Sequence, residues 1–453
     1  MANSDLPLKA KGSAAQTLPR QTQTVQTVRR GARLMRTWLT PGIGVKRWAL
    51  LLMAGIAVCG IAIAEFLRQN ADGGTLSPLL HLVTLRFLLP TPRILVGLIL
   101  GVGVILLAFY KLNRSILAPF VKRDADSFVN TVEAYYRRQR GARVVAIGGG
   151  TGLPAVLRAM KPYTLNLTAI VTVADDGGSS GKLRREMGVL PPGDIRNNIA
   201  ALADDEHLVT QLFQYRFENG GGLAGHSFGN LLLTAMADIT GSMDQAIIEA
   251  GKVLNITGRV LPATLSDVKL CAEVRDERGL RRVEGESNIP EAGGRVERVY
   301  LEPEHPRPYP DTIRAILNAD LVVIGPGSLY TSILPNLLVE GMPEAIRASS
   351  ALCVYVCNIA TQQGETGGYG VADHVAALEH HIGKGVIDII LANNATPQLN
   401  AGERTKYVPL AHPHDPIRER YRLIEVDLAD PNRPWRHSPT KLARVLMGLI
   451  PTI

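Results

Sequence analysis

The sequence predicts an α/β protein: a Rossmann-like, mostly parallel sheet with helices on both faces and a small β insertion, preceded by an N-terminal two-helix transmembrane hairpin. From Val144 onward, apolar strand-like runs such as RVVAIGGG and ADLVVIGPGS alternate with helical patterns, which is typical of a parallel sheet covered on both sides. Before that point, residues 48–64 and 94–110 form two apolar runs without a charged side chain. Each run is close to the shortest stretch that spans a bilayer as a helix.

The positive charge of the chain is confined to its N-terminal tail. The 453 residues carry a formal net charge of +8, and nine Lys and Arg residues but a single acidic residue, Asp5, precede Trp48. The basic and acidic residues of the remaining chain balance. A neutral folded part argues against a nucleic-acid-binding groove, so we expect no nucleic-acid partner.

Basic residues also flank the two apolar runs. They crowd before Trp48 and resume at Lys111, whereas the loop between the runs contains only Arg68, Arg86 and Arg93. The positive-inside rule then places both ends in the cytoplasm, which predicts a multi-pass protein of the cell membrane with a cytoplasmic C-terminal domain. Two buried core helices are the alternative, which the absence of a polar face disfavours. The late start of the first run disfavours a signal peptide.

These features divide the chain into four predicted parts. We expect a basic disordered tail over 1–46, the transmembrane hairpin over 47–110, an amphipathic connector over 111–140 and an α/β domain over 141–453. The connector is expected either to lie along the membrane surface or to pack on the domain. Within the domain, residues 268–289 predict a β-hairpin or meander inserted into the core.

The cysteines predict no disulfide framework. One of the four, Cys59, lies inside the first apolar run. Cys353 and Cys357 lie in the apolar run ALCVYVCNIA, where their spacing puts both thiols on one face of a strand. No His cluster accompanies them, so buried free thiols are expected rather than a metal site.

A glycine run, GGGTG at 148–152, joins the first predicted strand of the domain to a helix. This arrangement directs backbone N–H groups and a helix N-terminus to one point, which suits a phosphate. It is not the dinucleotide-binding fingerprint, because the third required glycine falls on Leu153. Nor does GGSSGKL around Lys182 form a P-loop, since the first glycine of that motif falls on Asp176 and its closing Ser or Thr is Leu183.

Further polar, glycine-rich loops follow the predicted strands. Asp175 and Asp176 come after the second strand, where they could accept hydrogen bonds from sugar hydroxyls or hold Mg²⁺ through water. Each loop alone would suggest a capped turn, but ligands gather at the carboxyl ends of parallel strands, so a shared site is expected. The other candidates in these loops are Ser179, Ser180, Gly181, Arg184, Arg196, His226, Asn230, Asn358, Thr361, Gln362 and Glu365, with the loop GPGSLYTS at 325–332.

Seven motifs occur in the order AIGGGTGLP, ADDGGSSGKLR, PPGDIRN, GHSFGNLLL, YLEPE, GPGSLYTSILPNLL and TQQGETGGY. They resemble the YvcK-type gluconeogenesis factor family, relatives of the 2-phospho-L-lactate transferase (CofD) family, over roughly residues 142–445. The resemblance implies a Rossmann-like domain that binds a nucleotide sugar, UDP-N-acetylglucosamine. It also implies a role in cell shape and in carbon flow into envelope precursors, through binding rather than an established reaction. The hairpin and tail depart from the compact soluble members, so membrane attachment rests on the residues alone.

The resemblance also implies which residues contact the ligand. The first glycine loop would face the diphosphate or nucleoside, Asn197 would lie at the centre of the cleft and Tyr330 on the opposing wall. Arg436, in the segment WRHSPTKLARVL, would bind the diphosphate. The full implied set is Gly149, Gly150, Thr151, Gly152, Asp175, Asp176, Ser179, Ser180, Arg184, Asp194, Arg196, Asn197, His226, Asn230, Gly325, Gly327, Ser328, Tyr330, Asn358, Thr361, Gln362 and Arg436.

Two function classes stay open. A ligand-sensing regulator needs affinity but neither a base nor a nucleophile. A CofD-like transferase would move a phospholactyl-type group from a nucleotide-linked donor to a deazaflavin, and would need a metal near Asp175 or Asp176 to steady the departing phosphate. Aromatic residues make up only 5% of the chain, which favours the regulator because a deazaflavin needs an aromatic-lined pocket. The sequence leaves open whether any reaction is catalysed, whether Mg²⁺ is required and whether a homo-oligomer forms.

Overall fold

The computed structural model of the protein describes residues 45–69, 90–117, 133–397 and 406–450. The chain forms two compact units, Met1–Thr131 and Val132–Ile453. Nearly all of the predicted basic tail and the middle of the predicted connector lie outside the described residues.

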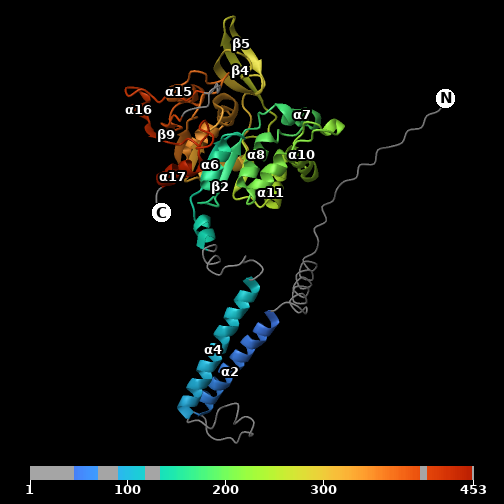
Figure 1. Cartoon of the computed structure of the whole chain (residues 1–453), viewed down its shortest axis with the longest axis vertical. Coiled ribbons are helices and arrows are strands. Elements are labelled where there is room, and N and C mark those ends of the chain that lie inside the picture. Colours follow the sequence, from blue (N-terminus) through green and yellow to red (C-terminus); the bar gives the residue numbers. More distant parts are fainter. Residues whose placement is uncertain (1–44, 70–89, 118–132, 398–405, 451–453) are drawn as a thin grey trace, which may run out of the picture. The chain divides into compact units, whose positions relative to one another are not determined.

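Two helices, α2 (Val45–Gln69) and α4 (Pro90–Leu117), make up the described part of the first unit. They pack against each other side by side (Figure 1). Small residues bring the two backbones close, because a Cβ atom added at Gly101 would overlap the Sγ atom of Cys59. Close approach at glycine is common where apolar helices associate in a membrane.

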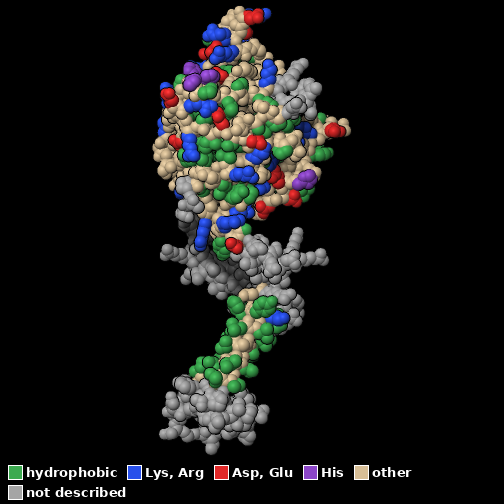
Figure 2. Space-filling view, turned by 60° about the vertical axis from the view of Figure 1, so that its left-hand side comes forward, with side chains coloured by type: hydrophobic (Ala, Val, Ile, Leu, Met, Phe, Trp, Pro, Cys, Tyr) green, Lys and Arg blue, Asp and Glu red, His purple; other side chains and the backbone are tan. Residues whose placement is uncertain are grey.

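The outer surfaces of these two helices are apolar. The side chains of Leu50, Met53 and Leu106 are 63% to 70% exposed, and Figure 2 shows hydrophobic side chains over most of this part of the molecule. One segment, Leu95–Asn113, is long and apolar enough to cross a membrane, whereas the apolar part of the other helix, Trp48–Ile61, is shorter. Among the described residues there is thus one candidate span where the sequence predicted two, and the two-span prediction is not supported.

A seven-stranded sheet forms the centre of the second unit. Its strands lie in the order β10-β9-β8-β7-β1-β2-β3, and all the neighbours pair in parallel. Helices lie on both faces of the sheet (Figure 1), so the central strands are apolar throughout. The predicted α/β fold is confirmed. The strands are β1 (Val144–Gly148), β2 (Leu167–Val171), β3 (Arg259–Pro262), β7 (Leu321–Ile324), β8 (Leu352–Val356), β9 (Ile389–Asn393) and β10 (Arg422–Val426).

Helices connect these strands. The first of them, α6, packs against α8 and against α17 near the C-terminus. The helices of this unit are α6 (Leu153–Met160), α7 (Gly178–Met187), α8 (Gly193–Leu202), α9 (Glu206–Gln214), the 3₁₀ turn η1 (Gly221–Leu223), α10 (Phe228–Thr240), α11 (Met243–Val253), α12 (Pro310–Leu317), the π-helix η2 (Leu329–Ile333), α13 (Leu334–Leu337), α14 (Met342–Ala348), α15 (Val371–Ile382), α16 (Ile417–Arg420) and α17 (Pro439–Leu449).

A second, antiparallel sheet is inserted between β3 and α12. It contains β4 (Lys269–Asp276), β5 (Gly279–Glu284) and β6 (Arg295–Glu302) in the order β5-β4-β6. The predicted insertion over 268–289 is confirmed as the β4–β5 hairpin, which lies at the tip of this unit in Figure 1. The third strand, β6, follows the predicted range and completes the small sheet.

The chain reverses direction across the main sheet between β1 and β7. From β1 the chain continues outward through β2 and β3, and from β7 it continues the other way through β8, β9 and β10. At the carboxyl ends of β1 and β7, the loops that follow these two strands therefore lead to opposite sides of the sheet. Open α/β sheets bind their ligands at such a switch point, and both glycine-rich loops of the sequence lie there.

Candidate functional site

The loop after β1 passes through a space that admits no side chains. A Cβ atom added at Gly150 would overlap the carboxylate of Asp194, and one at Gly152 would overlap the backbone carbonyl of Pro326. Thr151, between them, is exposed. The loop is thus held between the start of α8 and the loop after β7, and its outer side faces solvent.

The helix that follows this loop contributes positive charge. No side chain caps the start of α6, where Gly152 is the N-cap. The free N–H groups of a helix N-terminus and its dipole attract anions. Arg158, in the last turn of the same helix, lines the adjoining pocket and forms an ion pair with Glu206.

The opposite wall comes from the loops after β7 and β8. The side chain of Asn358 forms two hydrogen bonds with Gly327: it accepts from the backbone N–H at 3.0 Å and donates to the carbonyl at 2.8 Å. Ser328 Oγ donates to Gln362 Oε1 at 2.6 Å. These contacts fix the second glycine-rich loop against the segment that carries Thr361, whose hydroxyl donates to the carbonyl of Lys406.

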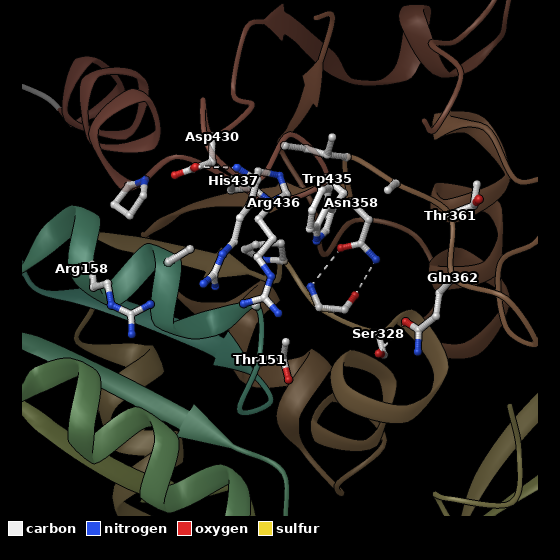
Figure 3. A pocket seen from close by; sticks show the side chains of 18 of the residues that line it. Thr151, Arg158, Ser328, Asn358, Thr361, Gln362, Asp430, Trp435, Arg436 and His437 are labelled. Carbon is white, nitrogen blue, oxygen red and sulfur yellow. Dashed lines mark hydrogen bonds between the residues drawn. The ribbon is translucent and has the colours of Figure 1, made fainter. Parts of the chain in front are cut away.

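A pocket of about 620 Å³ lies between these walls (Figure 3). Its third side is the segment 430–439, which is anchored where His437 Nε2 meets the carbonyl of Cys357 at 3.1 Å. Burial lowers the pKa of His437 to about 4, so this anchor is neutral at physiological pH. In Figure 3, Arg436 extends from this segment toward Thr151. Neither Arg436 nor Arg433 forms an ion pair with a carboxylate of the described residues, so both guanidinium groups can bind an anion.

Polar side chains from α7, from α10 and from the residue before its N-cap form a buried cluster. Ser179 Oγ lies 3.0 Å from His226 Nδ1, and Asn230 Nδ2 donates to Ser179 Oγ at 3.1 Å and to Ser180 Oγ at 3.4 Å. His226 lies before α10, because Ser227 caps that helix and accepts from the backbone N–H of Asn230. His226 is thus outside the helix and Asn230 inside it, and both side chains meet Ser179.

Arg196 brings a buried cation to this cluster. Its guanidinium donates to Ser227 Oγ at 2.5 Å and to Asn197 Oδ1 at 3.0 and 3.2 Å. Burial is the main reason why the pKa of Arg196 is lowered, and repulsion from the neighbouring Arg216 lowers it further. Asn197 is thereby held at the glycine loop, where its Nδ2 would meet a Cβ atom added at Gly150 at 2.9 Å.

Three carboxyl groups converge on the same end of the glycine loop. Burial raises the pKa of all three. The pKa of Asp194 rises to about 7 and that of Glu286 to about 8. Repulsion from Asp175 adds to the shift of both Asp194 and Glu286. At neutral pH, Asp194 and Glu286 therefore hold protons for part of the time.

Glu286 comes from the inserted sheet, and its carboxylate forms no hydrogen bond or ion pair with the described residues. It belongs to the turn after β5, which the neighbouring Ser287 fastens to the loop after β2. Ser287 donates its backbone N–H at 3.0 Å and its hydroxyl at 2.8 Å to Asp176 Oδ1. The carboxylate of Asp176, predicted to face the ligand, is thus engaged by the insertion.

The structure does not bring two other predicted residues to the pocket. Arg184 pairs with Asp267 and donates to the carbonyl of Val268, so it also fastens the insertion. Tyr330 is buried, with its hydroxyl 2.9 Å from that of Tyr369. Burial, with this hydrogen bond, raises the pKa of Tyr330 well above its usual value. Its backbone N–H donates to the buried Glu365 Oε2 at 3.2 Å.

The remaining predicted residues fall into two groups around the glycine loop. Gly149, Gly150 and Gly325 lie within two residues of a lining residue in the chain, and the cluster around Ser179 is linked to the glycine loop through Arg196 and Asn197. The predicted residues that line it are Thr151, Gly152, Gly327, Ser328, Asn358, Thr361, Gln362 and Arg436. Sequence reasoning missed Arg158, Arg433, Trp435 and Glu286. The sequence RPWRH at 433–437 was a signal for Arg433 and Trp435, because both lie within three residues of the predicted Arg436.

The sequence left open whether Asp175 and Asp176 hold a metal ion. Among the described residues, no three His, Cys, Asp or Glu side chains are arranged to hold a metal ion. Of the two predicted ligands, Asp175 belongs to the carboxyl cluster and Asp176 accepts from Ser287. The cysteines behave as predicted, since Cys353 and Cys357 are free and buried.

Comparison with known proteins identifies relatives over most of the chain. Residues 144–429 match the family described as 2-phospho-L-lactate transferase CofD. A putative gluconeogenesis factor of Nostoc sp. is 45% identical over 428 residues, which cover 90% of this chain and 91% of that protein. The gluconeogenesis factor of Bacillus subtilis is 56% identical over 252 residues, covering 56% of this chain and 78% of that one. An X-ray structure of a Bacillus halodurans protein is similar with a TM-score of 0.64 and 46% identity, covering 68% of this chain and 100% of that chain.

Proposed function

This chain belongs to the gluconeogenesis factor family and carries a CofD-like domain, and on that basis we propose that it is a regulatory protein that binds a nucleotide sugar. The proposed ligand is UDP-N-acetylglucosamine. Binding would report the supply of envelope precursors and so affect carbon metabolism, envelope synthesis and cell shape. A sensor of this kind requires affinity and a conformational response, and requires no reaction.

One observation carries the proposal: the pocket combines the three features that a diphosphate needs. The glycine loop exposes Thr151 and leads into the start of α6, where no side-chain cap competes with an anion. Arg433 and Arg436 supply positive charge without a carboxylate partner among the described residues. Guanidinium groups bind phosphate oxygens through paired hydrogen bonds.

The rest of the pocket suits the other parts of such a ligand. Thr361, Gln362 and Ser328 offer hydroxyl and amide groups that could bind sugar hydroxyls or a base. Trp435 lines the same pocket and offers an aromatic surface on which a base could stack. A cavity of about 620 Å³ is within the range that holds a small ligand.

A CofD-like transferase is the second candidate, and the raised pKa values of Asp194 and Glu286 favour it. Groups that titrate near neutral pH are suited to proton transfer. Carboxylate oxygens are the ligands that Mg²⁺ prefers, so Asp175 and Asp194 fit this ion, whereas Asp176 would have to leave Ser287. Bound there, Mg²⁺ would neutralise charge on a departing phosphate.

We also propose that the protein is attached to the cell membrane through α4, with α2 as a partner helix, and that its α/β domain lies in the cytoplasm. The support is the apolar outer surface of Leu95–Asn113 and the basic residues that flank the pair of helices.

The test is calorimetric titration of the full-length protein, in detergent, with UDP-N-acetylglucosamine, UDP-glucose, UDP, CDP and GDP. Saturable binding that is strongest for the first ligand is expected. After incubation with Mg²⁺, the nucleotide sugar should be recovered unchanged by chromatography. Absence of binding by every uridine nucleotide would refute the proposal, and turnover of the sugar would favour the transferase.

A further inference from the structure

A short helix fixes the entry of the chain into the α/β domain. Residues 133–139 are helical, and the backbone carbonyl of Arg138 accepts from the N–H of Leu165 at 2.9 Å. Arg138 Nη2 donates to Thr257 Oγ1 at 3.1 Å, and Asn166 Nδ2 donates to the carbonyl of Gly141 at 2.7 Å. The end of the predicted connector therefore packs on the domain, at the side where β1 and β2 begin.

A second cavity opens at this same side of the sheet. It has a volume of about 480 Å³ and is lined by the first residues of β1, β2 and β3, at the opposite end of these strands from the proposed ligand pocket. Three arginines from different elements, Arg143, Arg259 and Arg314, line it together with Asn166 and Asn318. Arginine and asparagine side chains from several elements thus meet at one opening.

Arginine outnumbers acidic residues around this cavity. Two of the three lining arginines are paired, Arg143 with Asp320 at 2.5 Å and Arg314 with Asp311 at 2.5 Å. Arg259 donates only to a hydroxyl, that of Thr168. We call this surface the amino-edge face. Its residues are Glu133, Tyr135, Tyr136, Arg137, Arg138, Arg140, Arg143, Tyr163, Arg259, Asp311, Arg314 and Asp320.

The amino-edge face also exposes aromatic rings. Tyr135, Tyr136 and Tyr163 are 52%, 56% and 44% exposed. The backbone carbonyl of Tyr163 lies against Gly141, where an added Cβ atom would meet it at 2.7 Å. Arginine and tyrosine together are typical of surfaces at the membrane–water interface, where the ring reaches the headgroup level and the cation meets phosphate.

We infer that the amino-edge face is a binding surface for anionic lipid headgroups, with the cavity between Arg143, Arg259 and Arg314 receiving a headgroup phosphate. The six arginines exceed the three acidic residues of this face, and the exposed tyrosines distinguish it from a purely cationic surface. This inference goes beyond the binding of a nucleotide sugar, because the face lies at the other end of the strands. It requires no membrane-spanning helix, since every residue of the face belongs to Val132–Ile453.

The inference is tested on residues 132–453 without the N-terminal unit, so that a spanning helix cannot cause membrane association. This unit is compact by itself. The Bacillus halodurans structure matches 68% of this chain over its whole length, so a domain of this kind folds without an N-terminal unit. The protein is mixed with vesicles of phosphatidylcholine alone or with about one third phosphatidylglycerol, and bound protein is measured by flotation. Binding is expected only to the anionic vesicles, and it should be lost near 0.5 M NaCl because salt screens the charges.

The decisive variant replaces Arg137, Arg140 and Arg314 by Gln. All three are exposed and none belongs to the ligand pocket. Each basic residue near an anionic surface adds roughly tenfold or less to binding, so the triple variant should bind about a hundredfold more weakly. The matched control replaces Arg275, Arg278 and Arg281 of the β4–β5 hairpin by Gln and should bind like the wild type.

Three further results would overturn the inference. They are equal binding to both kinds of vesicle, equal loss in the test and control variants, and binding to a DNA duplex that is tighter than vesicle binding and depends on the same arginines. A melting temperature within a few degrees of the wild type verifies that the variants are folded. Unchanged binding of UDP-N-acetylglucosamine by the triple variant is also expected, and keeps this test separate from that of the proposed function.

Discussion

Ser287 donates both its backbone N–H and its hydroxyl to the Asp176 carboxylate, at 3.0 and 2.8 Å, and so fastens the inserted sheet to the loop after β2. The same turn places Glu286 at the end of the glycine loop. The insertion therefore forms part of the candidate site, although its strands lie outside the main sheet.

Asp176→Asn should destabilise the fold. The change keeps the size of the side chain and an oxygen that accepts, but it removes the charge that strengthens both hydrogen bonds from Ser287, and hydrogen bonds to charged groups contribute about 1.5 to 3 kcal/mol. We expect the free energy of unfolding to fall by about 1 to 2 kcal/mol in urea titrations. Ser287→Ala should have a similar effect, and the double variant should lose little more than either single one. Additive losses would show that the two residues act independently.

Arg436→Gln should weaken the binding of UDP-N-acetylglucosamine about ten- to a hundredfold, because a charged hydrogen bond to the diphosphate is lost. Calorimetry with the full-length protein measures this effect. Arg433→Gln should act in the same direction. The control is Arg278→Gln in the β4–β5 turn, which removes the same charge from an exposed position away from the pocket. Equal affinity of Arg436→Gln and wild type would place the diphosphate elsewhere.

Gly150→Ala should abolish ligand binding, since its Cβ atom would overlap the Asp194 carboxylate and displace the loop. The readout is the rise in melting temperature on adding ligand, which depends on the ratio of ligand concentration to the dissociation constant. Gly222→Ala is a matched control, because no atom lies within 4 Å of a Cβ atom added there. A normal ligand-induced rise in Gly150→Ala would exclude this loop from the site.

Glu286→Gln should change how stability depends on pH. The pKa of Glu286 in the folded protein, about 8, lies above its ordinary value of 4.5. Its carboxyl group therefore favours the folded state fully below about pH 4.5, and this contribution is lost as the pH rises through about 8. The variant should match the wild type near pH 4.5 and exceed its stability by about 1 to 4 kcal/mol near pH 8.5.

Urea titrations at the two pH values test this expectation. Asp194→Asn should show the same trend over a window that ends near pH 7, because burial raises the pKa of Asp194 to about 7. The control is Glu291→Gln, which changes an exposed carboxylate in the turn between β5 and β6 and should leave the pH dependence of stability as in the wild type. A constant difference between Glu286→Gln and wild type across the pH range would contradict the assignment.

The membrane attachment predicts where reporter proteins are active. A reporter fused after Ile453 should be active in the cytoplasm only, as should one fused before Trp48, since basic residues flank both apolar segments. Periplasmic activity of the second fusion alone would indicate that only the α4 segment crosses the membrane.

The sequence predicted the main sheet because its strands are short apolar runs that end in glycine-rich loops, a pattern that depends on local residues. The two loops around Thr151 and Ser328 were placed correctly for the same reason, since parallel strands bring their carboxyl ends to one edge.

Contacts between distant segments could not be predicted in this way. Nothing near Arg184 in the sequence indicates that it pairs with Asp267, and nothing near Glu286 indicates four other carboxylates in its surroundings. These positions are decided by how the inserted sheet folds back onto the domain. Local patterns of charge and hydrophobicity do not encode that placement.

The cationic wall of the pocket comes from the last part of the chain, whereas the glycine loop comes from the first strand of the domain. Arg433, Arg436 and the anchor at His437 precede α17, which packs on α6 directly beside that loop. A polypeptide cut before residue 430 would possess the glycine loop and Arg158 but neither Arg433 nor Arg436. Truncation before residue 430 should therefore abolish the binding proposed for this pocket, although the strands of the main sheet all precede that residue.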